Sequence, residues 1–218
     1  YPSIKKVGPD LSISKSGRSC EEITRPLRSG IGKLLRHLNI VGDGVAIHYS
    51  QPSIHGEFII GQGERITSSQ KAWVHLLRDL GVDPGYVSYE QVEQGELVKG
   101  GHKLFIMPFS VALSRKEIEQ IKAFVRQGGV VIGDAMTGIM DNHCKPWNPS
   151  PVDDLFGLSR QGDPGGRSGK VLIPPRGPFA GMSRGVILMT SFVEEGLKPV
   201  GAKAMGRLSS GRSGLLIN

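Results

Sequence analysis

The amino-acid sequence predicts an α/β fold, a doubly wound parallel sheet followed by a C-terminal antiparallel β elaboration. Four short apolar runs lie between residues 44 and 134, and amphipathic stretches with helix-capping residues separate them. Apolar runs without polar alternation are typical of parallel strands that are covered on both faces. Since crossovers between parallel strands are right-handed, we expect helices on both sides of this sheet. Beyond residue 141 the helical periodicity stops and turn residues become frequent.

The N-terminal forty residues are predicted to be an arm that leaves a preceding domain, with the domain proper at 41–218. Proline and glycine interrupt residues 1–18, as in a linker. Ser19 with Glu22 matches a capping box and predicts the start of a helix, which Pro26 kinks or restarts. Apolar residues at helical spacing continue this helix to residue 39.

Capping residues and apolar runs define the elements between residues 41 and 140. Thr67 is expected to cap one helix, and Ser114 with Glu117 forms a capping box for another. Residues 50–66 are expected to be a loop, and one or two helical turns are expected at 90–97. The predicted strands are Val45–Tyr49, Tyr86–Tyr89, Lys103–Met107 and Val130–Asp134.

The last third of the chain is expected to contain short strands that return to the sheet. A short helix is predicted at 152–158 and a Gly/Pro/Arg loop at 160–169. The strands expected after it are Val171–Ile173, Val186–Met189, Ala202–Met205 and Leu215–Ile217.

Composition narrows the possible partners. The formal charge is +7, but no run of four basic residues occurs and no aromatic residues interleave with them, so nucleic acid is not expected as a partner. No apolar run approaches the roughly 18 residues that span a bilayer, so no membrane partner is expected. Because the first residue is not Met and no signal core follows, we expect the chain to begin inside a longer protein, and its compartment stays open.

Candidate binding residues follow the strands of the predicted sheet. In doubly wound folds ligands bind where the carboxyl ends of the strands meet. We take polar side chains in those positions as candidates for a binding site. They are Ser50, Gln51, His55, Ser110, Asp134 and Asp141.

No catalytic residue, metal site or cofactor is predicted. Ser110, His143 and Asp141 could form a triad, but the GxSxG elbow that would support it is absent. His143 and Cys144 are adjacent and therefore point apart, and Asp134, Asp141, His143 and His55 match no metal-ligand spacing. Neighbouring acids such as Asp153–Asp154 diverge and cannot flank a glycosidic bond.

Four motifs in this order resemble the trimerisation domain of microbial β-galactosidases, which has the flavodoxin-like fold of class I glutamine amidotransferases. The resemblance covers about residues 40–160 and the terminal strands. The motifs are Val45–Ser53, Trp73 with Leu76–Gly81, Leu104–Pro108 with Ala112–Ser114, and Phe124–Asp134 with Asp153–Gly157 after it.

The resemblance implies a non-catalytic oligomerisation domain of a glycoside hydrolase. In that family a catalytic barrel precedes this domain and carries the catalytic glutamates. The implied partners are that barrel, other copies of the chain in a trimer, and the carbohydrate substrate of the parent enzyme. Asp134–Ala135 stands where an amidotransferase has its cysteine, which implies an inactive site. The alternative is a stand-alone amidotransferase-like small-molecule hydrolase or sugar-binding protein.

An apolar contact surface is expected in the loop at 50–66. Ile54, Phe58, Ile59 and Ile60 lie in a glycine-rich setting and make this segment more apolar than a solvated loop should be, and Ile54, Phe58 and Ile60 are taken as the candidate interface residues. The amphipathic helix at 19–39 could bridge to a barrel or a neighbour. Both segments could instead cover the domain's own sheet.

Overall fold

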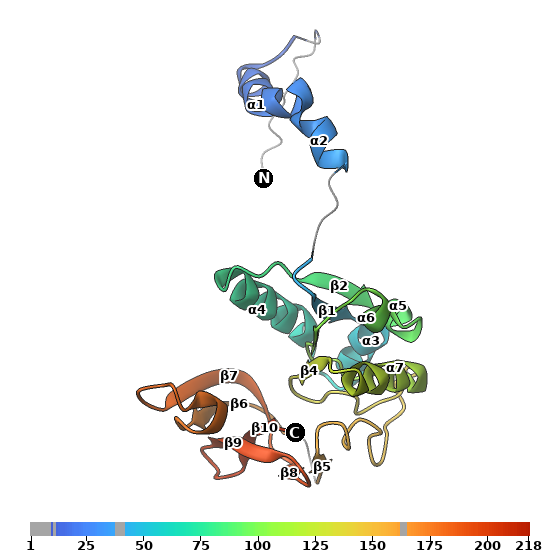
Figure 1. The fold of residues 1–218 in the computed structure, drawn as a ribbon, viewed down its shortest axis with the longest axis vertical. Coiled ribbons are helices and arrows are strands. Elements are labelled where there is room, and N and C mark those ends of the chain that lie inside the picture. The colour runs from blue at the N-terminus through green and yellow to red at the C-terminus, as the bar shows by residue number, and fades with distance from the viewer. Residues whose placement is uncertain (1–9, 11, 38–41, 162–164) are drawn as a thin grey trace. The chain divides into compact units, whose positions relative to one another are not determined.

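The chain divides into two compact units, Tyr1–Val41 and Gly42–Asn218, in the computed structural model (Figure 1). The structure describes residues 10, 12–37, 42–161 and 165–218. No helix in these ranges is both long enough and apolar enough to cross a membrane.

The N-terminal arm is helical from residue 15. It contains α1 (Lys15–Pro26), η1 (Leu27–Ile31) and α2 (Gly32–His37). The helix is broken at Gly30, which has φ 123°, and not at Pro26 as predicted, because Pro26 keeps helical backbone angles. The capping box expected at Ser19 is wrong, because Ser14 caps α1 by accepting the Gly17 amide at 3.1 Å, one turn earlier. The Ser19 hydroxyl instead donates back to the Lys15 carbonyl. No residue of the three segments is buried within the arm.

The predicted parallel sheet is confirmed. Its strands are β1 (Val45–Tyr49), β2 (Gly85–Ser88), β3 (Leu104–Met107) and β4 (Val130–Gly133), all paired in parallel in the order β2-β1-β3-β4. The chain moves outward from β1 first to one side and then to the other, which is the doubly wound arrangement. The central strands β1 and β3 are the most deeply buried.

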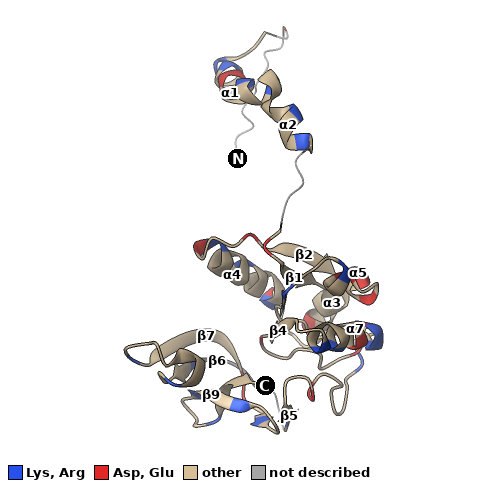
Figure 2. Ribbon diagram, in the orientation of Figure 1, with Lys and Arg blue, Asp and Glu red and all other residues tan. Residues whose placement is uncertain are grey.

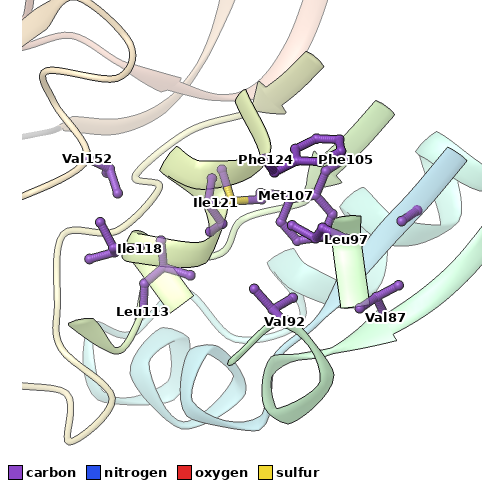
Figure 3. Packing of buried hydrophobic residues seen from close by; sticks show 11 residues of the cluster. Val87, Val92, Leu97, Phe105, Met107, Leu113, Ile118, Ile121, Phe124 and Val152 are labelled. Atoms are coloured by element: carbon purple, nitrogen blue, oxygen red, sulfur yellow. The ribbon is translucent and has the colours of Figure 1, made fainter. Parts of the chain in front are cut away.

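Helices on both faces bury this sheet. They are α3 (Gln51–Ile59), α4 (Arg65–Asp79), α5 (Tyr89–Glu93), α6 (Glu96–Lys99) and α7 (Arg115–Arg126). The capping box at Ser114 and Glu117 forms as predicted and starts α7. Phe105, Met107, Ile121 and Phe124 belong to one fully apolar core cluster between β3 and α7 (Figure 3).

The loop expected at 50–66 is wrong, because most of it is helix α3. The Ser50 hydroxyl accepts the Ser53 amide at 3.2 Å, and Pro52 lies in the first turn, where its missing N–H costs nothing. Helix α4 likewise begins at Arg65 rather than after a Thr67 cap. The segment 152–157 forms turns rather than the expected short helix.

The antiparallel elaboration is confirmed, but its strands form sheets of their own instead of returning to the parallel sheet. The larger sheet contains β6 (Gly165–Ile173), β7 (Val186–Glu194), β9 (Lys203–Leu208) and β10 (Ser213–Ile217), in the order β10-β9-β6-β7. A second sheet pairs β5 (Leu158–Arg160) with β8 (Leu197–Pro199), and η2 (Gly177–Phe179) follows β6. Strand β6 occupies much of the predicted loop at 160–169. We call residues 42–157 the parallel lobe and 158–218 the antiparallel lobe.

Candidate functional site

A chain of hydrogen bonds between buried polar side chains begins at the carboxyl end of the parallel sheet. His48 on β1 contacts Ser110 Oγ through Nδ1 at 2.9 Å and Glu117 Oε1 through Nε2 at 3.1 Å. Glu117 Oε2 accepts the Ser114 amide at 2.7 Å, and the Ser114 hydroxyl donates to Glu93 at 2.6 Å. The chain therefore joins β1, the turn after β3, and helices α5 and α7.

The hydrogen-bonded order of serine, histidine and carboxylate matches that of a hydrolytic triad, but these three side chains are buried inside the protein. Ser110, His48 and Glu117 are each at most 1% exposed. Phe105 covers the imidazole with its ring, with centroids 5.4 Å apart. The Ser110 hydroxyl in this position cannot reach a substrate in solution. In this conformation the hydrogen bonds of Ser110, His48 and Glu117 hold elements of the fold together.

Sequence reasoning placed Ser110 at this edge and rejected a triad of Ser110 with His143 and Asp141. The structure pairs Ser110 with His48 rather than with His143, which is exposed. The Asp141 carboxylate accepts the backbone amides of His143 and Lys145, both at 2.9 Å, and so organises its own loop. His48 was missed although it is the one polar residue inside the apolar run of the first strand, a signal that the sequence carries.

Asp134 holds a strained turn at the same edge. Phe109 follows β3 with φ 43°, a left-handed conformation that is rare for a bulky residue. The Asp134 carboxylate accepts the Phe109 amide and the Ser69 hydroxyl, and so ties this turn to the end of β4 and to α4. Crowding by protein atoms raises the pKa of Asp134 to about 6, against the lowering effect of these hydrogen bonds.

Replacing Asp134 with asparagine is expected to change the pH dependence of stability. The raised pKa means that the folded chain holds a proton between about pH 4 and 6 that the unfolded chain releases. This group therefore lowers the free energy of unfolding as pH rises through that window. Because the Asp134 side chain is partly open to solvent, we expect it to lower the free energy of unfolding by about 1 kcal/mol across this pH window, an effect that the asparagine variant lacks. Urea unfolding at pH 4.5 and 7 measures it, and an identical pH difference in both proteins would refute this assignment.

Arg160 and the groups that it binds, which we call the Arg160 cluster, join the two lobes, and the sequence analysis missed them. Arg160 on β5 binds the Asp153 carboxylate, Glu194 Oε1 at 2.8 Å and the Thr137 carbonyl at 2.9 Å. Glu194 Oε2 in turn accepts the Met136 amide at 2.6 Å. Met136 has φ 58°, so this carboxylate also holds a strained turn after β4.

The remaining candidate residues are distributed over several places. Gln51 and His55 share a 3.1 Å hydrogen bond along the exposed side of α3, and Ser50 is buried as its cap. Burial raises the pKa of the Cys144 thiol, which lies 3.6 Å from the Pro52 carbonyl. Within the described ranges, no group of three or more His, Cys, Asp or Glu is arranged to hold a metal ion.

The candidate interface residues divide into two kinds. Ile54 and Ile60 pack partly against the apolar cluster that contains Val111 and Met140. Phe58 is 82% exposed, and its neighbour Ile59 is 63% exposed. The exposed apolar surface at the end of α3 is therefore formed by Phe58 and Ile59.

Comparison with known proteins identifies the fold. No protein-family model and no curated protein sequence matches the chain. Among solved structures, the cold-adapted β-galactosidase from Rahnella sp. R3 aligns with 95% of this chain at a TM-score of 0.76 and 16% identity. A catalytic mutant of a GH42 β-galactosidase from G. stearothermophilus aligns with 93% of this chain, at a TM-score of 0.67 and 17% identity. The β-galactosidase from Halorubrum lacusprofundi aligns with 94% of this chain, at a TM-score of 0.64 and 17% identity.

The chain corresponds to only part of each of these proteins. It spans 31% of the Rahnella chain, 28% of the G. stearothermophilus chain and 29% of the Halorubrum chain. At these identities the likeness concerns the fold, and at that level the resemblance to a domain of β-galactosidases is confirmed.

Proposed function

We propose that this chain is a non-catalytic contact domain of a larger, β-galactosidase-like glycoside hydrolase. It would join the catalytic barrel of that enzyme to other copies of itself, in a trimer if the resemblance extends to assembly. The observation that carries the proposal is the shared fold, which covers more than nine tenths of this chain but less than a third of each β-galactosidase. The carbohydrate substrate would then be bound by the parent enzyme's barrel.

The chemistry of the sheet edge supports a structural role. In amidotransferase-like enzymes the turn after a central strand presents a nucleophile to the substrate. Here the polar groups at the sheet edge are engaged by other groups of the protein: Ser110 contacts His48, and Asp134 accepts the Phe109 amide and the Ser69 hydroxyl. These contacts use the functional groups to fix strained turns.

The exposed end of α3 supports a contact role. Phe58 and Ile59 are adjacent, and together they present aromatic and aliphatic surface that has no partner among the described residues. Burying two such side chains contributes about 3–6 kcal/mol at about 1.5–3 kcal/mol each, a large share of the free energy of a typical association.

Replacing Phe58 and Ile59 together with aspartate is expected to weaken self-association at least about tenfold, because two charges would be buried in the contact. The mass of the chain in solution, measured by light scattering over a concentration series, reports this directly. The matched control replaces Leu76 and Leu80, which are also exposed and belong to α4 and its C-cap, with aspartate. If both double variants associate like the wild type, the end of α3 is not the contact.

A stand-alone hydrolase remains the alternative function, since serine, histidine and glutamate are already hydrogen-bonded in the order of a triad. Assays with nitrophenyl galactosides and with glutamine distinguish the two. We expect no turnover, whereas turnover that disappears in a Ser110→Ala variant would establish the alternative.

A further inference from the structure

The two lobes of the domain carry opposite net charge. The parallel lobe has ten Lys and Arg against fourteen Asp and Glu, a net charge of −4. The antiparallel lobe has nine Lys and Arg against three Asp and Glu, a net charge of +6. Acidic residues are visible around α5, and basic residues on β9 (Figure 2). A surface of one sign on each lobe favours contact between unlike surfaces of two copies.

One face of the antiparallel sheet combines this positive charge with exposed apolar side chains. Cross-strand pairs place Leu172 opposite both Ile187 and Arg207, and Lys170 opposite Met189. Directly paired residues share a face of a sheet, and so do Lys170 and Leu172, which are two apart. We call these five residues, Lys170, Leu172, Ile187, Met189 and Arg207, the outer face.

The outer face is open in the described structure. Leu172, Ile187 and Met189 are 51%, 59% and 72% exposed, and both cations are exposed. On the opposite face Val171 and Leu208 are buried in the core of the antiparallel lobe, whereas Leu188, which pairs with Val171, is 44% exposed. The outer face is therefore an apolar surface on the side of the sheet away from the core cluster of Val171 and Leu208.

Strand β7 is also an edge strand, and within the described ranges protein atoms cover it only near Ser191 and Phe192, where Arg65 donates to the Ser191 carbonyl at 3.2 Å. The sheet order is β10-β9-β6-β7, so one side of β7 has no strand partner among the described residues. Four consecutive apolar residues, 186–189, lie on this strand with each at least 38% exposed. Natural sheets usually protect such an edge with charges, proline or a covering segment. Residues 186–193 of β7 carry no charge, so this part of the strand offers an uncharged surface to a partner.

We propose that the outer face binds the acidic surface of the parallel lobe of a second copy of this chain, centred on helices α5 and α6. Glu90 is exposed there and Glu96 is half-buried, whereas Glu93 already binds the Ser114 hydroxyl. Val98 adds exposed apolar surface beside them. In this contact Lys170 and Arg207 of the outer face lie opposite these carboxylates. Leu172, Ile187 and Met189 are buried between the two copies. This contact joins unlike surfaces, and such contacts close into rings or pair reciprocally.

The inference rests on the proposed self-association and gives it a second contact, separate from Phe58 and Ile59 at the end of α3. Three proteins test it: the wild type, a Lys170→Glu, Arg207→Glu variant, and a Glu90→Lys, Glu96→Lys variant. Each variant alone is expected to associate at least tenfold more weakly than the wild type in sedimentation velocity. An equimolar mixture of the two is expected to regain association, because the reversed charges are complementary. Association of the wild type is expected to weaken between 0.05 and 0.5 M NaCl, at constant pH, by screening.

The outcomes separate the two proposals. A wild type that associates equally at both salt concentrations, with both variants unchanged, would overturn this contact and leave the proposed function standing. A wild type that stays monomeric would overturn both. Where a charge reversal disturbs folding, seen by circular dichroism, Lys170→Gln with Arg207→Gln replaces it and must weaken association in the same direction.

Discussion

Replacing Arg160 with methionine is expected to lower the free energy of unfolding by about 3–5 kcal/mol. Its guanidinium is mostly buried and binds two buried carboxylates, those of Asp153 and Glu194. Methionine has a similar length but leaves both negative charges without their cation in a poorly solvated place. Removing one partner of a buried ion pair typically costs this much, because the remaining charge stays desolvated.

Urea unfolding of the Arg160 variant measures the loss, and the chain supplies a matched control. Arg212 pairs with Glu195 at 3.3 Å, but both side chains are well exposed. Exposed pairs contribute about 0–1 kcal/mol, so Arg212→Met should change stability little. Equal losses in the two variants would show that the Arg160 cluster does not fasten the antiparallel lobe to the turn after β4.

Replacing Glu117 with alanine is expected to lower the free energy of unfolding by about 3 kcal/mol. The carboxylate is completely buried and serves the imidazole of His48 and the amide of Ser114 at once. Its loss leaves two buried polar groups unsatisfied, at about 1–3 kcal/mol each, and removes half of the capping box of α7.

The control for Glu117 lies two residues away on the same helix. Glu119 is exposed, so Glu119→Ala should change the free energy of unfolding by no more than about 0.5 kcal/mol. Thermal and urea unfolding of both variants provide the comparison. A loss below about 1 kcal/mol for Glu117→Ala would mean that water replaces the carboxylate and that the buried chain is not a structural support.

The features that could be predicted from the sequence depend on neighbouring residues. The capping box of Ser114 and Glu117 spans three residues, and each parallel strand is one apolar run, so both follow from local rules. Helix α3 was missed because Pro52 and Gly56 look like breakers. Pro52 is in fact tolerated in the first turn, and Gly56 lies against Val111, where a side chain would collide.

The features that could not be predicted depend on residues far apart in the chain. His48 and Glu117 are 69 residues apart, and Arg160 and Glu194 are 34 apart. Such pairs exist only once the sheet order is set. The separate antiparallel sheet was missed for the same reason, because an apolar run does not show which strand it will pair with.

The most direct test of the proposed contact function is the mass of the 218-residue chain at sedimentation equilibrium. The chain has a mass of 23.5 kDa. We expect the measured mass to rise with concentration toward a whole multiple of this value, up to about 100 µM, as for an association with a dissociation constant in the micromolar range. A mass of one chain throughout that range would contradict the account.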